Sequence, residues 1–202
     1  MNYTGPKVRL SRYLGVPLTP KAARVMEKKP HPPGQHGTSR KRFSKISDYK
    51  RQLVEKQRLR CQYNVSEKQM VNYYKRASQR FGNNVDNIVQ VLETRLDAIV
   101  LRAGLARTIY AARQYVSHRH ILVNGKRVNI PSYNVEIGDV VAVKPKSQKM
   151  VCFEDALESI VSTPDYIERS KKDMSVKLLY LPKRDEVPII CDVPLVIEYY
   201  SR

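Results

Sequence analysis

The spacing of apolar residues changes along this chain, and the change predicts a helical part followed by a mixed part. Between residues 47 and 93 apolar positions recur every three or four residues, as in amphipathic helices. Ser47 can cap the first helix, and Ser66 with Gln69 forms a capping box before an apolar face that reaches Phe81. The pattern predicts three helices, over about residues 48–61, 67–81 and 85–93.

Near Thr94 the pattern restarts, and helices begin to alternate with short apolar runs. Gly104 can end a short helix over about residues 95–103, and Thr108 can cap a second helix that runs to Ser117. The rest of the chain predicts a strand at 140–143, a helix at 153–161, a strand at 177–181 and a tail at 192–200. We favour a short helix for the tail, although its apolar run would also suit a strand.

Residues 121–128 carry the strongest local signal. Asn124-Gly125 stands between the apolar run 121–123 and Val128. Asn-Gly in this setting predicts a β-hairpin, because a type I′ turn needs positive φ at both central residues. Together with the two preceding helices, the hairpin predicts an α+β unit in which two helices pack on an antiparallel sheet.

Composition adds a strong electrostatic signal. The 202 residues include 37 Lys and Arg against 19 Asp and Glu, which gives a formal net charge of +18. This excess favours a nucleic-acid partner over an anionic membrane. No apolar run is long enough to span a bilayer, the first residues do not resemble a signal peptide, and three widely spaced cysteines fit reduced thiols. We therefore expect a cytosolic protein without membrane contact.

The first 46 residues are basic and poor in apolar side chains. They contain the breakers Pro32-Pro33-Gly34 and the strongly basic tract at residues 40–45. We interpret them as an extended arm that orders on RNA. The alternative is a solvated tail, which is disfavoured because the charge is almost all positive.

Catalytic and metal-binding signatures are missing. The sequence has no glycine-rich phosphate loop and no Gly-x-Ser-x-Gly elbow. The histidines occur in two pairs, His31 with His36 and His118 with His120, and no cysteine pair has zinc-finger spacing. We therefore expect no enzyme activity, no metal and no cofactor.

An RNA partner explains the remaining features best. No Asp or Glu occurs between Arg102 and Arg127, so one helix end and the hairpin turn would present only positive charge. The chain also has 13 tyrosines, several of them beside cations, and tyrosine can stack on exposed bases. A basic face that is merely solvated is the alternative.

At these residues the chain resembles a known family. The segment RLDAIVLRAGLARTIYAARQYVSHRHILVNGKRVNIPSYNVEIGDVV is similar to the RNA-binding domain of the ribosomal protein S4 family. The segments GPKVRLSR, PPGQHG, SDYKRQLVEKQRLR and VIEYYSR resemble its bacterial or organellar form. The resemblance covers essentially the whole chain in order.

The resemblance implies a fold and a role. It implies a basic arm at 1–46, a helical domain at 47–93 plus about 190–202, and an inserted domain at 94–189 whose RNA-binding core covers 95–158. It also implies a structural constituent of the small ribosomal subunit, in the cytoplasm or an organelle, which binds rRNA, nucleates subunit assembly and contributes to translational accuracy. Implied partners are neighbouring small-subunit proteins, including S5, and mRNA in members that repress their own translation. No small-molecule substrate is implied.

The sequence departs from the family pattern in the arm and at Arg119, among other positions. Many relatives carry zinc-binding cysteines in the arm, where this chain has residues such as Val8, Leu10 and Tyr13, so the zinc-free form is implied. Arg119 replaces a glycine that is common in the family, which adds a cation and constrains the backbone.

These considerations define two sets of candidate RNA contacts. In the inserted domain they are Arg107, Arg113, Gln114, Ser117, His118, Arg119, Asn124 and Lys126. In the arm they are Lys7, Arg9, Arg12, Gln35, His36, Arg40, Lys41 and Arg42.

Two alternatives use the same kind of RNA-binding domain. An RNA-modifying enzyme would need a catalytic domain, for which residues 162–202 are too few. A stalled-ribosome RNA-binding module would be shorter and would lack the arm and the helical region.

Overall fold

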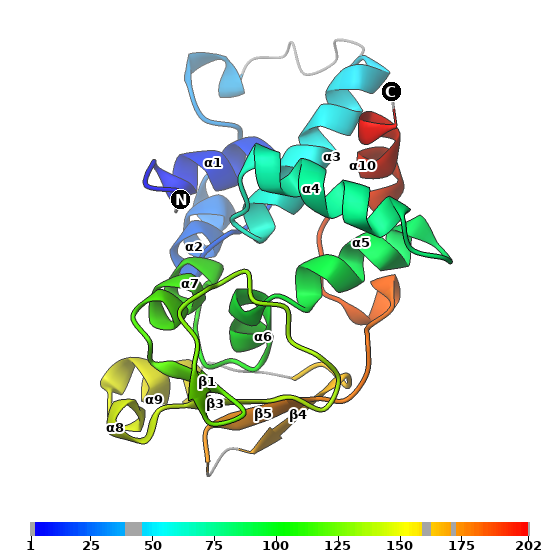
Figure 1. Ribbon diagram of the computed structural model, residues 1–202. Coiled ribbons are helices and arrows are strands. Elements are labelled where there is room, and N and C mark those ends of the chain that lie inside the picture. The colour runs from blue at the N-terminus through cyan, green and yellow to red at the C-terminus, as the bar shows by residue number, and fades with distance from the viewer. Residues whose placement is uncertain (1–2, 39–45, 159–162, 171–172, 202) are drawn as a thin grey trace. The chain divides into compact units, whose positions relative to one another are not determined.

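The computed structural model describes residues 3–38, 46–158, 163–170 and 173–201 (Figure 1). The chain forms two compact units. The first comprises Met1–Tyr74 and Ile189–Arg202, and the second comprises Lys75–Pro188. The chain therefore leaves the first unit, builds the second and returns to complete the first.

The first unit is helical. Helix α10 lies along α3 (Figure 1). The ring of Tyr200 stacks on Tyr74 with 5.2 Å between centroids, and its hydroxyl donates to Glu67 Oε1 at 2.8 Å. The C-terminal tail is thus a helix, as favoured from the sequence. The described elements of this unit are α1 (Lys7–Leu14), α2 (Pro20–Lys28), the 3₁₀ turn η1 (Gln35–Gly37), α3 (Asp48–Gln62), the first part of α4 (Glu67–Ser78) and α10 (Val193–Tyr200).

Residues 3–38 are more folded than an extended arm. Leu14, Val16, Leu18 and Ala22 are buried around α1 and α2. Arg58 on α3 donates from Nε to the Leu14 carbonyl at 2.7 Å, which ties the end of α1 to the unit. A few apolar residues suffice here because α3 supplies the surface against which they pack.

The predicted helix starts in residues 47–93 are confirmed. Ser47 accepts a hydrogen bond from the Lys50 amide at 3.4 Å, and Ser66 and Gln69 exchange the two bonds of a capping box. The end of the second helix was predicted wrongly. Helix α4 stops at Ser78, so Phe81 lies beyond it and is fully exposed.

The second unit combines helices with a five-stranded sheet. Its strands pair in the order β2-β1-β3-β5-β4, and every pairing is antiparallel. This confirms the α+β fold class. Its elements are the end of α4, α5 (Asn84–Glu93), α6 (Leu96–Arg102), α7 (Ile109–Ser117), β1 (Ile121–Val123), β2 (Lys126–Arg127), β3 (Val140–Val143), α8 (Pro145–Gln148), α9 (Val151–Glu158), β4 (Ile167–Ser170), β5 (Ser175–Leu178) and the 3₁₀ turn η3 (Arg184–Glu186).

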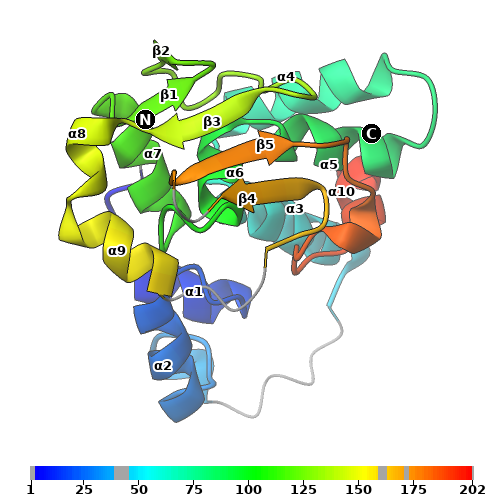
Figure 2. The same ribbon diagram turned by 90° about the horizontal axis from the view of Figure 1, so that it is seen from below.

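The strand register explains the core of this unit. Ile121 pairs with Val143 and Val123 with Val141, and all four side chains are buried. Because side chains alternate along a strand, these residues share one face of the sheet. Helices α6 and α7 lie behind the strands in the view of Figure 2.

Helix α5 belongs to the second unit through buried polar contacts. Glu93 at its end forms an ion pair with Arg102 at 2.7 Å and accepts a hydrogen bond from the Tyr166 hydroxyl at 3.0 Å. The second unit therefore begins before Thr94. The pattern of apolar residues in the sequence restarts only at Thr94.

The elements after β3 were predicted less well. Strand β5 starts and ends earlier than the predicted strand at 177–181, and β4, whose sequence is Ile-Glu-Arg-Ser, was missed. Its central charges hide any apolar alternation. Helix α9 covers most of the predicted helix at 153–161, of which residues 159–161 lie outside the described residues.

Candidate nucleic-acid interface

The hairpin turn has the predicted geometry. Asn124 and Gly125 have φ angles of 48° and 78°, and Val123 pairs with Lys126 across the turn. Positive φ at both positions is the signature of a type I′ turn. The side chains of Lys126 and Arg127, the two residues of β2, are exposed beside it.

Asn124 fixes the turn through its side chain. Its Nδ2 donates to Asp139 Oδ1 at 2.8 Å, and its Oδ1 accepts from the Val140 amide at 2.9 Å. Both ends of the amide therefore contact protein. Asn124 positions the turn for its neighbours, and Lys126 and Arg127 provide the charge that a phosphate would meet.

The end of α7 is a Schellman motif with arginine in the glycine position. The Arg119 amide donates to the Val116 carbonyl at 2.9 Å, and the His120 amide donates to the Tyr115 carbonyl at 3.0 Å. Arg119 has a φ of 63°, in the left-handed region that favours glycine. The motif turns the Arg119 side chain to the surface, where it is exposed.

His118 and His120 differ although they are two residues apart. His118 is exposed. His120 lies near Phe153 and has its Nδ1 2.9 Å from Ser147 Oγ. Burial lowers the pKa of His120, and the nearby His118 and Lys144 lower it further. His120 is therefore neutral at pH 7 and adds no charge to the interface.

Arg113 is held inside the fold. Its side chain is 13% exposed, and its guanidinium lies 3.8 Å from a carboxylate oxygen of Asp97, which is 0% exposed. Arg95 donates from Nε to the other oxygen of Asp97 at 2.9 Å. Burial raises the pKa of Asp97, while Arg95 and Arg113 oppose that rise. Arg113 thus anchors α7 to α6.

The other candidates on α7 are at the surface. Gln114 and Ser117 are exposed and lie three residues apart, so they share one face of the last turns. Arg107, just before α7, is half-exposed and forms a surface ion pair with Asp155 at 3.9 Å. The structure therefore gathers Gln114, Ser117, His118 and Arg119 at the end of α7.

The end of α7 and the hairpin turn are close along the chain. Asn124 follows Arg119 by five positions, so the two residues are at most about 17 Å apart. We call these exposed residues, Gln114, Ser117, His118, Arg119, Lys126 and Arg127, the hairpin face. A length on this scale spans a few backbone phosphates of a nucleic acid.

Sequence reasoning left out further cations of the second unit. Arg127 was not selected, although it lies next to Lys126. Lys144, Lys146 and Lys149 flank and occupy α8, and Lys146 and Lys149 are exposed. In the sequence, lysines alternate with Pro145 and Ser147, and this pattern could have identified them as a further basic cluster.

The N-terminal candidates lie in the first unit. Arg9, Gln35 and His36 are exposed. Arg12 donates from Nε to the Lys29 carbonyl at 3.3 Å and to the His31 carbonyl at 3.0 Å, so it also holds the chain after α2. Lys7, at the start of α1, is half-buried. Arg40, Lys41 and Arg42 lie outside the described residues.

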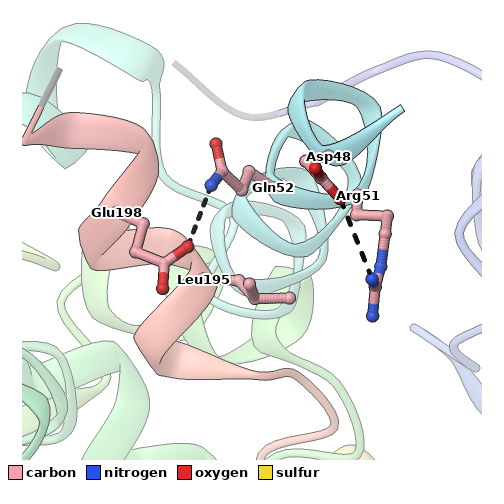
Figure 3. A pocket seen from close by; sticks show the side chains of 5 residues that line it. All are labelled: Asp48, Arg51, Gln52, Leu195 and Glu198. Carbon is pink, nitrogen blue, oxygen red and sulfur yellow. Dashed lines mark hydrogen bonds and ion pairs between the residues drawn. The ribbon is translucent and has the colours of Figure 1, made fainter. Parts of the chain in front are cut away.

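A small pocket between α3 and α10 in the first unit differs in character from the hairpin face (Figure 3). Its volume is about 230 Å³, below the roughly 300–1,000 Å³ of ligand pockets. Gln52 donates from Nε2 to Glu198 at 2.9 Å, and its buried Oε1 has no hydrogen-bond partner among the described residues. The size does not favour a substrate site. The lining residues are Asp48, Arg51, Gln52, Leu195 and Glu198.

The described residues contain neither a candidate metal site nor a candidate membrane-spanning helix. Within residues 3–38, 46–158, 163–170 and 173–201, no three His, Cys, Asp or Glu side chains are grouped so that they could hold a metal ion. In the same part of the chain no helix has the length and apolar character needed to cross a membrane.

Two family models of RNA-binding ribosomal proteins and domains match this chain. Residues 2–93 match the family described as "Ribosomal protein S4/S9 N-terminal domain", and residues 94–141 match "S4 domain". The second match starts at Thr94, where the pattern of apolar residues restarts.

Curated relatives extend the match to the whole chain. "Small ribosomal subunit protein uS4" of Thermobifida fusca is 47% identical, with 100% of both chains covered. Those of Streptomyces avermitilis and Tropheryma whipplei strain Twist are 49% and 52% identical, with at least 96% of each chain covered. The chain belongs to the uS4 family of small ribosomal subunit proteins. The predicted family is confirmed, and with it a structural ribosomal role in place of an enzymatic one.

Proposed function

We propose that the chain binds small-subunit rRNA mainly through the hairpin face and that basic residues of the N-terminal segment add a second contact. The observation that carries this proposal is the hairpin face itself. Arg119, Lys126 and Arg127 are exposed there, and none of them pairs with a carboxylate among the described residues. Cations that lack an acidic partner in the protein are available to backbone phosphates.

The arrangement also suggests a division of labour. Arg119, Lys126 and Arg127 would neutralise phosphates, and Gln114 and Ser117 would donate to phosphate, sugar or base edges. We propose that residues 94–189, which follow α5 and lie almost wholly in the second unit, act as an inserted RNA-binding domain with its core at 95–158, and that residues 47–93 and 190–202 are the helical segments before and after it in the sequence. From the N-terminal segment, Lys7, Arg9, Gln35 and His36 would join them, together with Arg40, Lys41 and Arg42.

The role that fits the family is early binding of rRNA in the small subunit. We propose that the chain nucleates assembly there, contributes to translational accuracy, and contacts neighbouring ribosomal proteins, including S5. Repression of its own mRNA is a further role of the same surface. Its place is the ribosome, in a bacterial cytoplasm or, for an organelle-encoded chain, in the organelle.

Salt-dependent binding tests this proposal. If about eight phosphates are neutralised, the logarithm of the binding constant for small-subunit rRNA falls with the logarithm of salt at a slope of roughly −6 to −7. The double variant Arg119→Ala/Lys126→Ala removes two of these contacts, so its slope is shallower by about 2. Filter binding of the transcript at four salt concentrations measures both slopes.

A matched variant controls for net charge. Lys177→Ala/Lys183→Ala removes two exposed cations elsewhere in the second unit and leaves the slope unchanged. A flat titration of the unaltered protein, or equal losses in the two double variants, would refute binding through the hairpin face.

A further inference from the structure

Phe81 lies in the loop between α4 and α5 and has no protein surface over its ring. It is the most exposed of the large apolar side chains in the described residues. From the sequence it was expected on the buried face of the second helix, four residues after Ala77. The helix instead ends at Ser78, which leaves Phe81 in the loop.

Hydrogen bonds from a buried side chain hold the backbone of the loop that carries Phe81. The buried side chain of Asn87 donates from Nδ2 to the carbonyls of Ala77 at 3.3 Å, Arg80 at 3.2 Å and Phe81 at 3.4 Å. Gly82 follows with a φ of 104°, which its lack of a Cβ allows. The backbone of Phe81 is therefore fixed while its ring points away from the core.

The surroundings of Phe81 are positively charged. Lys75 and Arg76 lie in the last turn of α4, and Arg80 precedes Phe81; all three are exposed. The sequence between Glu67 and Asp86 contains no Asp or Glu. Among the described residues no carboxylate forms an ion pair with these three cations. An apolar protein partner would not explain this charge, whereas a nucleic acid would.

We propose that Phe81 stacks on an unpaired rRNA base while Lys75, Arg76 and Arg80 bind the phosphates beside it. This site is separate from the hairpin face in sequence, and it rests on the proposed binding of rRNA. An aromatic ring can stack on any base, and neighbouring cations can bind the phosphates of the nucleic-acid backbone. Proteins bind single-stranded nucleic acids in this way. A fixed backbone lowers the entropy lost on binding.

The test separates stacking from charge. Phe81→Ala should bind a small-subunit rRNA transcript about 5- to 150-fold more weakly, the range for loss of one stacked base, with an unchanged salt slope. Arg80→Ala should instead make the slope shallower by about 1. Because the ring is exposed, Phe81→Ala should keep the circular dichroism spectrum and melting temperature of the unaltered protein.

A direct probe of stacking is available because the chain has no tryptophan. In Phe81→Trp the only indole should be quenched when rRNA is added, with an affinity close to that of the unaltered protein. Tyr180 provides the control, since it is a 39% exposed aromatic residue near Glu186 and Asp165. Tyr180→Trp should show no quenching, and Tyr180→Ala should bind like the unaltered protein.

The possible results separate the two proposals. If Phe81→Ala binds normally and Phe81→Trp is not quenched, while Arg119→Ala/Lys126→Ala is weakened, the stacking site is refuted and the hairpin face stands. Equal losses in Phe81→Ala and Tyr180→Ala would also refute a specific stack. If the unaltered protein does not bind rRNA, the proposed function fails, and the stacking site fails with it.

Discussion

The α6–α7 junction and the hairpin face use the same kind of side chain for opposite tasks. At the junction, Arg95 and Arg113 surround the buried carboxylate of Asp97 and hold two helices together. At the hairpin face, Arg119 and Lys126 are exposed. Arg119 follows Arg113 by only six positions in the sequence. The difference shows that the fold, and not the position in a basic segment, decides whether a cation is held by a carboxylate or exposed at the surface.

The largest expected effect comes from breaking the junction. Asp97→Ala removes the buried carboxylate that the guanidinium groups of Arg95 and Arg113 face, and we expect it to reduce the free energy of unfolding by roughly 3–5 kcal/mol. Urea unfolding followed by circular dichroism measures the loss. Asp155→Ala, which removes the surface partner of Arg107, should change the same quantity by less than about 1 kcal/mol. Similar values for the two variants would show that the junction is not a buried ion-pair network.

A smaller effect is expected at Arg119, where charge and backbone preference conflict. Arg119→Gly removes a side chain from a left-handed position and should raise the free energy of unfolding by about 1 kcal/mol. It also removes one phosphate contact, so the salt slope of rRNA binding should become shallower by about 0.9.

Arg119→Ala separates the two contributions of this arginine. It loses the same charge but keeps a Cβ in the left-handed region, so it should weaken binding equally without the gain in stability. If both variants have the same stability, the backbone at Arg119 carries no strain.

The smallest effect concerns pH. The pKa of His120 is lowered in the folded protein, so the unfolded chain takes up a proton first as the pH falls. Stability is therefore unaffected well above pH 6.5, the usual value, and decreases as the pH falls below it. Thermal unfolding between pH 8 and pH 5 should show this decrease, and His120→Gln should reduce it. An identical pH profile for His120→Gln would contradict the assignment.

Local chemistry predicted much of this fold. Ser47, Thr108 and the Ser66–Gln69 box cap helices, and Asn124-Gly125 forms the type I′ turn. These signals succeed because the interactions they describe are made within a few residues of one another. The family resemblance rested on the same segments and was confirmed by relatives that cover the whole chain.

Packing between distant segments determines several features of the fold that local sequence patterns do not predict. Phe81 follows the helical spacing of its neighbours, but α4 ends at Ser78, and Asn87, ten residues after Ala77, donates to the Ala77 carbonyl near this end. Strand β4 has no apolar alternation and exists because β5 pairs with it. Residues 3–38 lack the composition of an independent core, yet α1 packs on both α2 and α3.

By itself, the sequence determined the family, the positive charge, the helix caps and the hairpin turn, since each depends on residue identity or on contacts between near neighbours. The tertiary structure decided which cations are available. Arg12 and Arg113 proved to be bound to protein groups, whereas Arg119, Lys126 and Arg80 are exposed. The physical reason is that the cost of burying a charge is met by its partners, and partners from distant segments are brought together only when the chain folds.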